Sequence, residues 1–105
     1  MTREDFLRNA EPHLIADVRM YATADGGRKT PAHLGWGCPC MVSLEEPLEG
    51  WDAWPILLGE PLKPGDERRL GMVFLSGEKA ATIMRDAGHF FLWEGRAIGE
   101  AKVIA

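Results

Sequence analysis

The hydrophobic pattern of this chain has a period of two, repeated in short runs that glycine and proline residues separate. The clearest run carries apolar side chains at alternate positions, Leu14, Ala16, Val18, Met20 and Ala22. Because successive side chains of a strand point to opposite faces of a sheet, this run predicts a half-buried antiparallel strand. The sequence Asp25-Gly26-Gly27 predicts the turn that ends it, since glycine adopts the backbone conformations that tight turns need.

Shorter runs predict further strands at residues 38–44, 56–58, 68–75, 89–93 and 97–104. Pro39 has no backbone N–H to donate, which places its strand at a sheet edge or at a bulge. Residues 45–54 contain several acids with Pro47 and Gly50, and are predicted to form a loop. About six short strands separated by turns indicate an all-β chain that closes into a small antiparallel barrel.

One segment has a helical period instead, with apolar residues Ala80, Ile83, Met84 and Ala87. This spacing follows one face of a helix, so a short helix is predicted within residues 76–88. Ser76 is expected to cap its start and Gly88 to end it. Near the N-terminus, Thr2 and Asp5 have the spacing of a capping pair, which predicts one short helical turn there.

Length and composition place all of these elements in one domain. A chain of 105 residues matches one domain, and its 46% of hydrophobic residues supplies a core. We expect a single domain over residues 1–105, with an N-terminal extension at 1–12 and the barrel at 13–105. The formal net charge is −4, from 12 basic and 16 acidic residues, which argues against a general binder of nucleic-acid backbones.

The sequence predicts a soluble, cytoplasmic protein. No secretory segment is visible at the N-terminus, and no run approaches the roughly 20 apolar residues that a membrane-spanning helix needs. Cys38 and Cys40 are too few and too close together for a secreted disulfide framework, so we expect reduced thiols.

Three motifs occur in the order found in one known family. They are Asp25-Gly-Gly-Arg-Lys-Thr-Pro31, Lys63-Pro-Gly-Asp66 and Phe91-Leu-Trp-Glu-Gly-Arg-Ala-Ile-Gly99, followed by Val103 in the last strand. Together they make residues 12–105 resemble the third, C-terminal β-barrel domain of elongation factor Tu. The resemblance implies a six-stranded antiparallel Greek-key barrel. Here the barrel has one inserted short helix, because residues 76–88 form a longer connection than the family has.

In that family a separate domain hydrolyses GTP, and the third domain binds the T stem of aminoacyl-tRNA, the exchange factor and the GTPase domain. This chain has no Gly-x-x-x-x-Gly-Lys-Ser/Thr loop to hold nucleotide phosphates. It therefore resembles a stand-alone third domain that binds no nucleotide and needs no cofactor. The resemblance implies a non-enzymatic, protein-binding module linked to translation, with a module that binds tRNA or other RNA as the alternative.

The residues that match the family's RNA-contacting loops are Arg28, Lys29, Thr30, Glu94, Gly95 and Arg96. Two departures bear on this match: the last hairpin is one glycine shorter, and Lys29 stands where the family commonly has histidine. Cys38 and Cys40 also replace an arginine and a glutamine, which removes two polar contacts.

The residue types around Arg28 have two interpretations. Arg28, Lys29 and Arg96 beside glycine amides have the composition of an anion-binding site. Alternatively, the segment is a structural turn in which Arg28 pairs with an acid of a neighbouring strand. The acidic composition of the chain favours this structural turn.

Trp36, Trp51 and Trp54 fall in predicted loops. Exposed tryptophans in loops are favoured anchors at protein interfaces, which makes these three the candidate protein-interaction residues. Alternatively, they cover the ends of the barrel. Trp93 lies in an apolar run and is expected in the core or on the barrel surface.

Cys38 and Cys40 are two residues apart on one face of a predicted strand, and with His33 or His89 they would offer ligands to zinc. A metal-binding or thiol-redox protein is therefore a further hypothesis, although free cysteine more commonly acts as a small buried hydrophobe. No serine or cysteine lies in a nucleophile motif with a histidine, and no two carboxylates have the spacing of an acid/base pair. We assign no catalytic residue.

Overall fold

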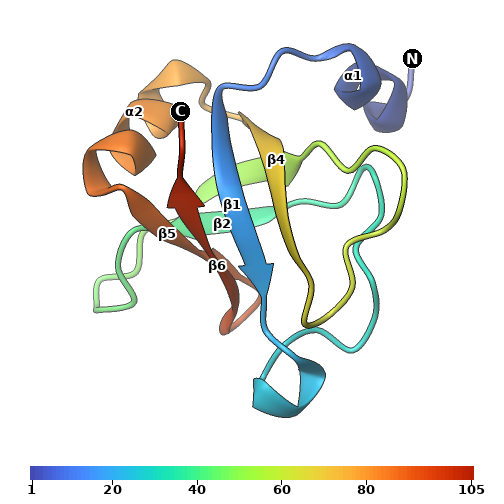
Figure 1. Ribbon diagram of the computed structural model, residues 1–105. Coiled ribbons are helices and arrows are strands. Elements are labelled where there is room, and N and C mark those ends of the chain that lie inside the picture. Colours follow the sequence, from blue (N-terminus) through green and yellow to red (C-terminus); the bar gives the residue numbers. More distant parts are fainter.

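The computed structural model of residues 1–105 is a closed β-barrel (Figure 1). Its strands are β1 (Leu14–Met20), β2 (Cys38–Met41), β3 (Trp51–Pro55), β4 (Glu67–Phe74), β5 (His89–Trp93) and β6 (Ala97–Val103). Neighbouring strands are all antiparallel, in the order β1-β4-β3-β2-β5-β6 around the barrel. Because β2, β3 and β4 are consecutive neighbours and β1 lies beside β4, the connection is a Greek key. The predicted six-stranded antiparallel Greek-key barrel is confirmed.

The helices lie outside the barrel wall. They are α1 (Arg3–Asn9) and α2 (Glu78–Ala87), and a 3-10 turn, η1 (Thr23–Asp25), follows β1. In Figure 1 both helices lie toward one end of the barrel and η1 lies toward the other. Neither helix combines the length and the apolar character needed to cross a membrane.

The ends of the helices follow the predictions in part. Thr2 and Asp5 form a capping box that starts α1, which is a full short helix instead of one turn. Gly88 ends α2 with a φ of 77°, as its lack of a side chain allows. The predicted cap by Ser76 is wrong, because Gly77 occupies the N-cap position and no side chain caps the helix.

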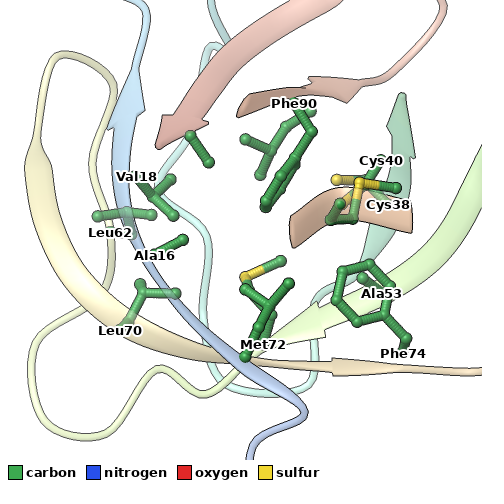
Figure 2. Close-up of a cluster of buried hydrophobic side chains, with 14 of the residues drawn as sticks. Ala16, Val18, Cys38, Cys40, Ala53, Leu62, Leu70, Met72, Phe74 and Phe90 are labelled. Atoms are coloured by element: carbon green, nitrogen blue, oxygen red, sulfur yellow. The ribbon is translucent and has the colours of Figure 1, made fainter. Parts of the chain in front are cut away.

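The barrel interior is filled by apolar side chains from alternate strand positions (Figure 2). In β1 the predicted alternation is confirmed, with Leu14, Ala16, Val18 and Met20 all buried. At the centre, the rings of Phe74 and Phe90 pack edge to face, with centroids 6.4 Å apart. Burial of this surface is the main contribution to the stability of the barrel.

The predictions fail around β2 and β3. Residues 51–55 form a strand where a loop was predicted, and the strand predicted at residues 56–58 is absent. Pro39 is not at an edge, because β2 lies between β3 and β5. Pro39 is opposite Asp52 of β3, and β5 pairs with β2 only at Cys40 and Met41. The missing N–H of Pro39 is therefore tolerated, since no ladder with β5 is formed at that position.

Candidate functional site

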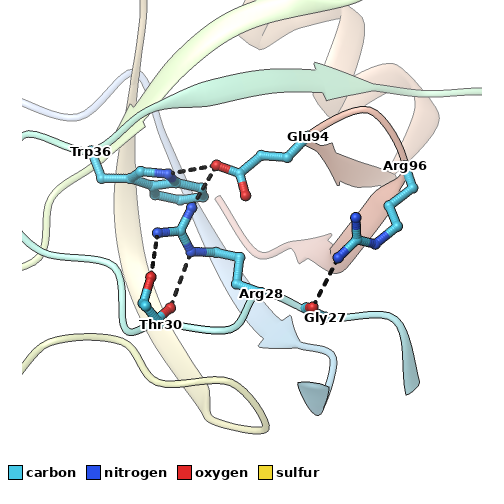
Figure 3. A network of polar contacts seen from close by, with 6 residues as sticks. All are labelled: Gly27, Arg28, Thr30, Trp36, Glu94 and Arg96. Atoms are coloured by element: carbon cyan, nitrogen blue, oxygen red, sulfur yellow. Dashed lines mark hydrogen bonds and ion pairs between the residues drawn. The ribbon is translucent and has the colours of Figure 1, made fainter. Parts of the chain in front are cut away.

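Residues of the predicted anion site meet where the segment after η1 lies against the turn between β5 and β6 (Figure 3). Arg28 Nη1 donates a hydrogen bond to Glu94 Oε2 at 2.5 Å, and Trp36 Nε1 donates to the same oxygen at 3.0 Å. The Arg28 guanidinium also lies over the Trp36 ring, 4.8 Å from its centroid. With Thr30, these residues form what we call the Arg28 cluster.

The other two nitrogens of the Arg28 guanidinium also donate hydrogen bonds. Arg28 Nε donates to Thr30 O at 3.2 Å, and Arg28 Nη2 donates to Thr30 Oγ1 at 3.3 Å. The Arg28 side chain is only 15% exposed. Its charge is paired with the Glu94 carboxylate, so the cluster holds the chain together and leaves little of the guanidinium for a phosphate. The structure has the pairing that the structural interpretation predicts, but its acid, Glu94, lies in the turn after β5 and not in a strand.

Arg96 is fixed by hydrogen bonds, whereas Lys29 is free. Arg96 Nε donates to Gly26 O at 2.7 Å and Arg96 Nη2 to Gly27 O at 3.1 Å, which ties the β5–β6 turn to the end of η1. Gly95 forms that turn with a φ of 74°, in the left-handed region that favours glycine. Lys29 is exposed and forms no ion pair. Of the predicted cationic residues, Lys29 and Arg96 are exposed and form no ion pair, so both are available to an anion.

The outer surface of β1, β4 and β6 carries two ion pairs between neighbouring strands. Asp17 accepts hydrogen bonds from Arg69 Nε and Nη2 at 2.8 and 3.1 Å, between residues directly opposite on neighbouring strands. Glu100 accepts from Arg19 Nη2 at 2.6 Å and from the hydroxyl of Tyr21 at 2.9 Å. The hydrogen bond from Arg69 lowers the pKa of Asp17, and those from Arg19 and Tyr21 lower the pKa of Glu100. We call this surface the paired charged face.

The tryptophans predicted to mediate protein contacts lie in three different settings. Trp36 belongs to the Arg28 cluster. Trp51 and Trp54 lie in β3, so the prediction that they occupy loops is wrong. Trp51 packs against the core, while Trp54 is on the outside of the barrel, next to Gly37. The structure does not bring these three tryptophans together as one surface.

The outer surface of β2, β3 and β5 is mostly apolar, in contrast to the paired charged face, with Asp52 and His89 as its polar outward residues. Core side chains alternate with outward ones along these strands. The outward apolar residues are Pro39, Met41, Trp54, Phe91 and Trp93. We call this surface the apolar face. From the sequence, Trp93 was expected in the core or on the barrel surface, and nothing in the sequence connected it with Pro39 or Met41.

A loop of residues 42–50 connects β2 to β3 and projects from the barrel, in green in Figure 1. All of its residues are exposed, including Val42, Leu44 and Leu48. The end of this loop, at Gly50, lies close to the apolar face: a Cβ atom added to Gly50 would be 2.9 Å from the Pro39 Cβ. A groove of about 290 Å³ is formed there, lined by Pro39, Met41, Leu48, Gly50, Asp52 and Trp93.

Cys38 and Cys40 both point into the core, among apolar side chains (Figure 2). Burial raises the pKa of the Cys40 thiol well above its usual value, so the reactive thiolate is disfavoured. No group of three or more His, Cys, Asp or Glu side chains is arranged to hold a metal ion. The structure does not bring His33 or His89 together with the cysteines as a metal site, and the metal and redox hypothesis gains no support.

Comparison with known proteins adds no family assignment. No protein-family model matches the sequence, and no curated protein matches it significantly.

Proposed function

We propose that this chain is a non-enzymatic, protein-binding module whose partner docks on the apolar face. The observation that carries the proposal is the division of the barrel's outer surface. Strands β1, β4 and β6 carry the ion pairs Arg19–Glu100 and Arg69–Asp17, whereas β2, β3 and β5 turn mainly aromatic and apolar side chains outward. Apolar patches with polar rims are typical of protein interaction sites, and tryptophan is enriched among the residues that dominate binding energy.

The distribution of charge supports a protein partner over a nucleic acid. Residues 30–62 contain five of the 16 acidic residues and none of the 12 lysines and arginines. This segment therefore has a formal charge of −5, against −4 for the whole chain. Glu45, Glu46, Glu49 and Asp52 all lie on the 42–50 loop or on β3, next to the apolar face. A partner with a basic rim would be attracted there, and a phosphate backbone repelled.

The resemblance to the third domain of elongation factor Tu indicates where to look first for the partner. That domain binds other proteins of the translation machinery in its family, so translation factors are the first proteins to test. The link to translation rests on the three sequence motifs alone.

The proposal is tested by affinity capture with two matched variants. Leu48→Ser changes an apolar residue that lines the groove. Ile104→Ser is the control, because Ile104 is 41% exposed, as Leu48 is. Its backbone N–H donates a hydrogen bond to Ile15 of β1, so it lies away from the groove. We expect a protein that binds the wild type and Ile104→Ser but not Leu48→Ser.

The second measurement uses that captured protein in purified form. Added to the isotopically labelled chain, it should shift amide NMR signals of β2, β3 and β5. Equal binding of both variants, or shifts confined to β1, β4 and β6, would show that the apolar face is not the docking surface.

A further inference from the structure

We propose that the groove on the apolar face receives a lysine or arginine side chain of the partner protein. This inference rests on the proposed function and names what the apolar face recognises. In this groove Trp93 contributes an aromatic ring and Asp52 a carboxylate. Met41 and Leu48 are apolar lining residues. These are the groups that a cation on an aliphatic stem requires.

The first argument is that Trp93 is the exception among the tryptophans. The chain has four tryptophans, and three have a cation of the chain over the ring. The cation-to-centroid distances are 5.3 Å for Arg3 over Trp54, 4.8 Å for Arg28 over Trp36 and 5.6 Å for Lys79 over Trp51. No lysine or arginine of this chain lies over Trp93, which faces the groove.

The second argument is a precedent within the same face. A neighbouring cavity of about 200 Å³ shares Pro39 and Asp52 with the groove and is lined by Trp54. In that cavity Arg3 of α1 supplies the cation over the tryptophan ring. Both hollows thus have a tryptophan ring near Pro39 and Asp52. In the groove the ring is that of Trp93 in place of Trp54, and no cation of this chain lies over it.

The third argument concerns charge and shape. Asp52 is exposed and takes part in none of the ion pairs of the chain, so its carboxylate can pair with an incoming cation. Met41 is 2% exposed although it points away from the core, because the returning loop covers it. The apolar surface that the methylene groups of a long cationic side chain can contact is therefore that of Leu48, which is 41% exposed and lines the groove.

The test is an NMR titration of the full chain with short Gly-Ser peptides that differ in one central residue. That residue is lysine, arginine, norleucine or glutamate, and the readout is the indole N–H signal of Trp93. The lysine and arginine peptides should bind at millimolar concentration, and added salt should weaken their binding. The norleucine peptide, which has the stem without the charge, should bind roughly 3- to 30-fold more weakly.

Two variants and a control locate the contact. Trp93→Leu should abolish the saturable shifts of the neighbouring amides. Asp52→Asn should weaken the binding of the lysine peptide by up to about 5-fold. Asp52 is exposed, so this change leaves the core of the barrel intact. Glu49→Gln makes the same change of charge on the 42–50 loop but outside the groove, and should leave the affinity unchanged.

The results separate this inference from the proposed function. If norleucine binds as well as lysine, if no peptide binds, or if Asp52→Asn behaves like Glu49→Gln, the cation site is wrong. The partner's sensitivity to Leu48→Ser would still support docking on the apolar face. If the lysine peptide binds at Trp93 but the partner binds Leu48→Ser as well as the wild type, the groove has the proposed chemistry and the docking surface is elsewhere.

Discussion

Glu94 is the residue whose removal most directly tests the Arg28 cluster. Glu94→Ala deletes the oxygen that accepts from both Arg28 and Trp36. A hydrogen bond to a charged group contributes about 1.5–3 kcal/mol, whereas an exposed ion pair contributes about 0–1 kcal/mol. The side chains of Arg28 and Glu94 are 15% and 35% exposed, so the cluster lies between these cases. We expect a loss of about 1.5 kcal/mol in the free energy of unfolding, or roughly 6–12 °C in Tm.

The assay is urea unfolding followed by circular dichroism and tryptophan fluorescence. Glu45→Ala is the control, because the exposed side chain of Glu45 forms no ion pair, and it should change stability by less than about 0.5 kcal/mol. A double-mutant cycle with Arg28→Met isolates the interaction of the two charges. The reasoning is refuted if Glu94→Ala is as stable as Glu45→Ala, or if the effects of Glu94→Ala and Arg28→Met simply add.

The same variant bears on the predicted binding of tRNA. In the wild type, Glu94 neutralises Arg28, which leaves Lys29 and Arg96 as the exposed cations that a phosphate can pair with. We therefore expect weak tRNA binding at low salt, which Glu94→Ala strengthens by freeing Arg28. Each additional phosphate that the variant neutralises should steepen the slope of log affinity against log salt by about 0.7–0.9. Tight binding by the wild type that Glu94→Ala leaves unchanged would contradict this account of the cluster.

Three further predictions concern other parts of the barrel. Gly27→Ala should destabilise the fold by about 1–3 kcal/mol in thermal melts, because an added Cβ would lie 2.0 Å from the Tyr21 carbonyl oxygen. Hydrogen bonds from Arg19 and Tyr21 lower the pKa of Glu100, so its contribution to stability is present above the ordinary pKa of about 4.3 and is lost as pH falls further. Glu100→Gln should accordingly flatten the dependence of unfolding free energy on pH in acid; a dependence identical to that of the wild type would contradict the assignment. Cys40, buried with a raised pKa, should react with a thiol reagent only after urea unfolds the chain, and rapid labelling of the native protein would show that the site opens.

The parts of the fold that sequence reasoning predicted well are those with one buried face. In β1 and β4 the core residues recur at every second position, Leu14 to Met20 and Leu70 to Phe74, so the period of two is visible in the sequence. The helix α2 and its end at Gly88 were also predicted, although Ala81 is buried in place of the predicted Ala87, which is exposed. These features are local, because each depends on residues within a few positions of one another.

Strand β3 shows why the rest was not predicted. Its sequence, Trp51-Asp-Ala-Trp-Pro55, has apolar residues on both faces, so no period of two is visible. Gly50 and Pro55 are also residue types typical of loops, which led to the prediction of a loop. The segment is a strand because Ala53 pairs with Cys38 on one side and Phe74 on the other. Tertiary context of this kind overrides weak local preference.

The candidate sites divide in the same way. The sequence by itself determined the strands with one clearly buried face, such as β1, and its motifs included Arg28 and Glu94. Only the tertiary structure decided that these two, 66 residues apart in the chain, face each other. It likewise decided that Trp93 shares a groove with Asp52, from another strand. Local periodicity sets which face of a strand is buried, whereas closure of the barrel sets which outward side chains become neighbours, and that depends on the pairing of distant strands.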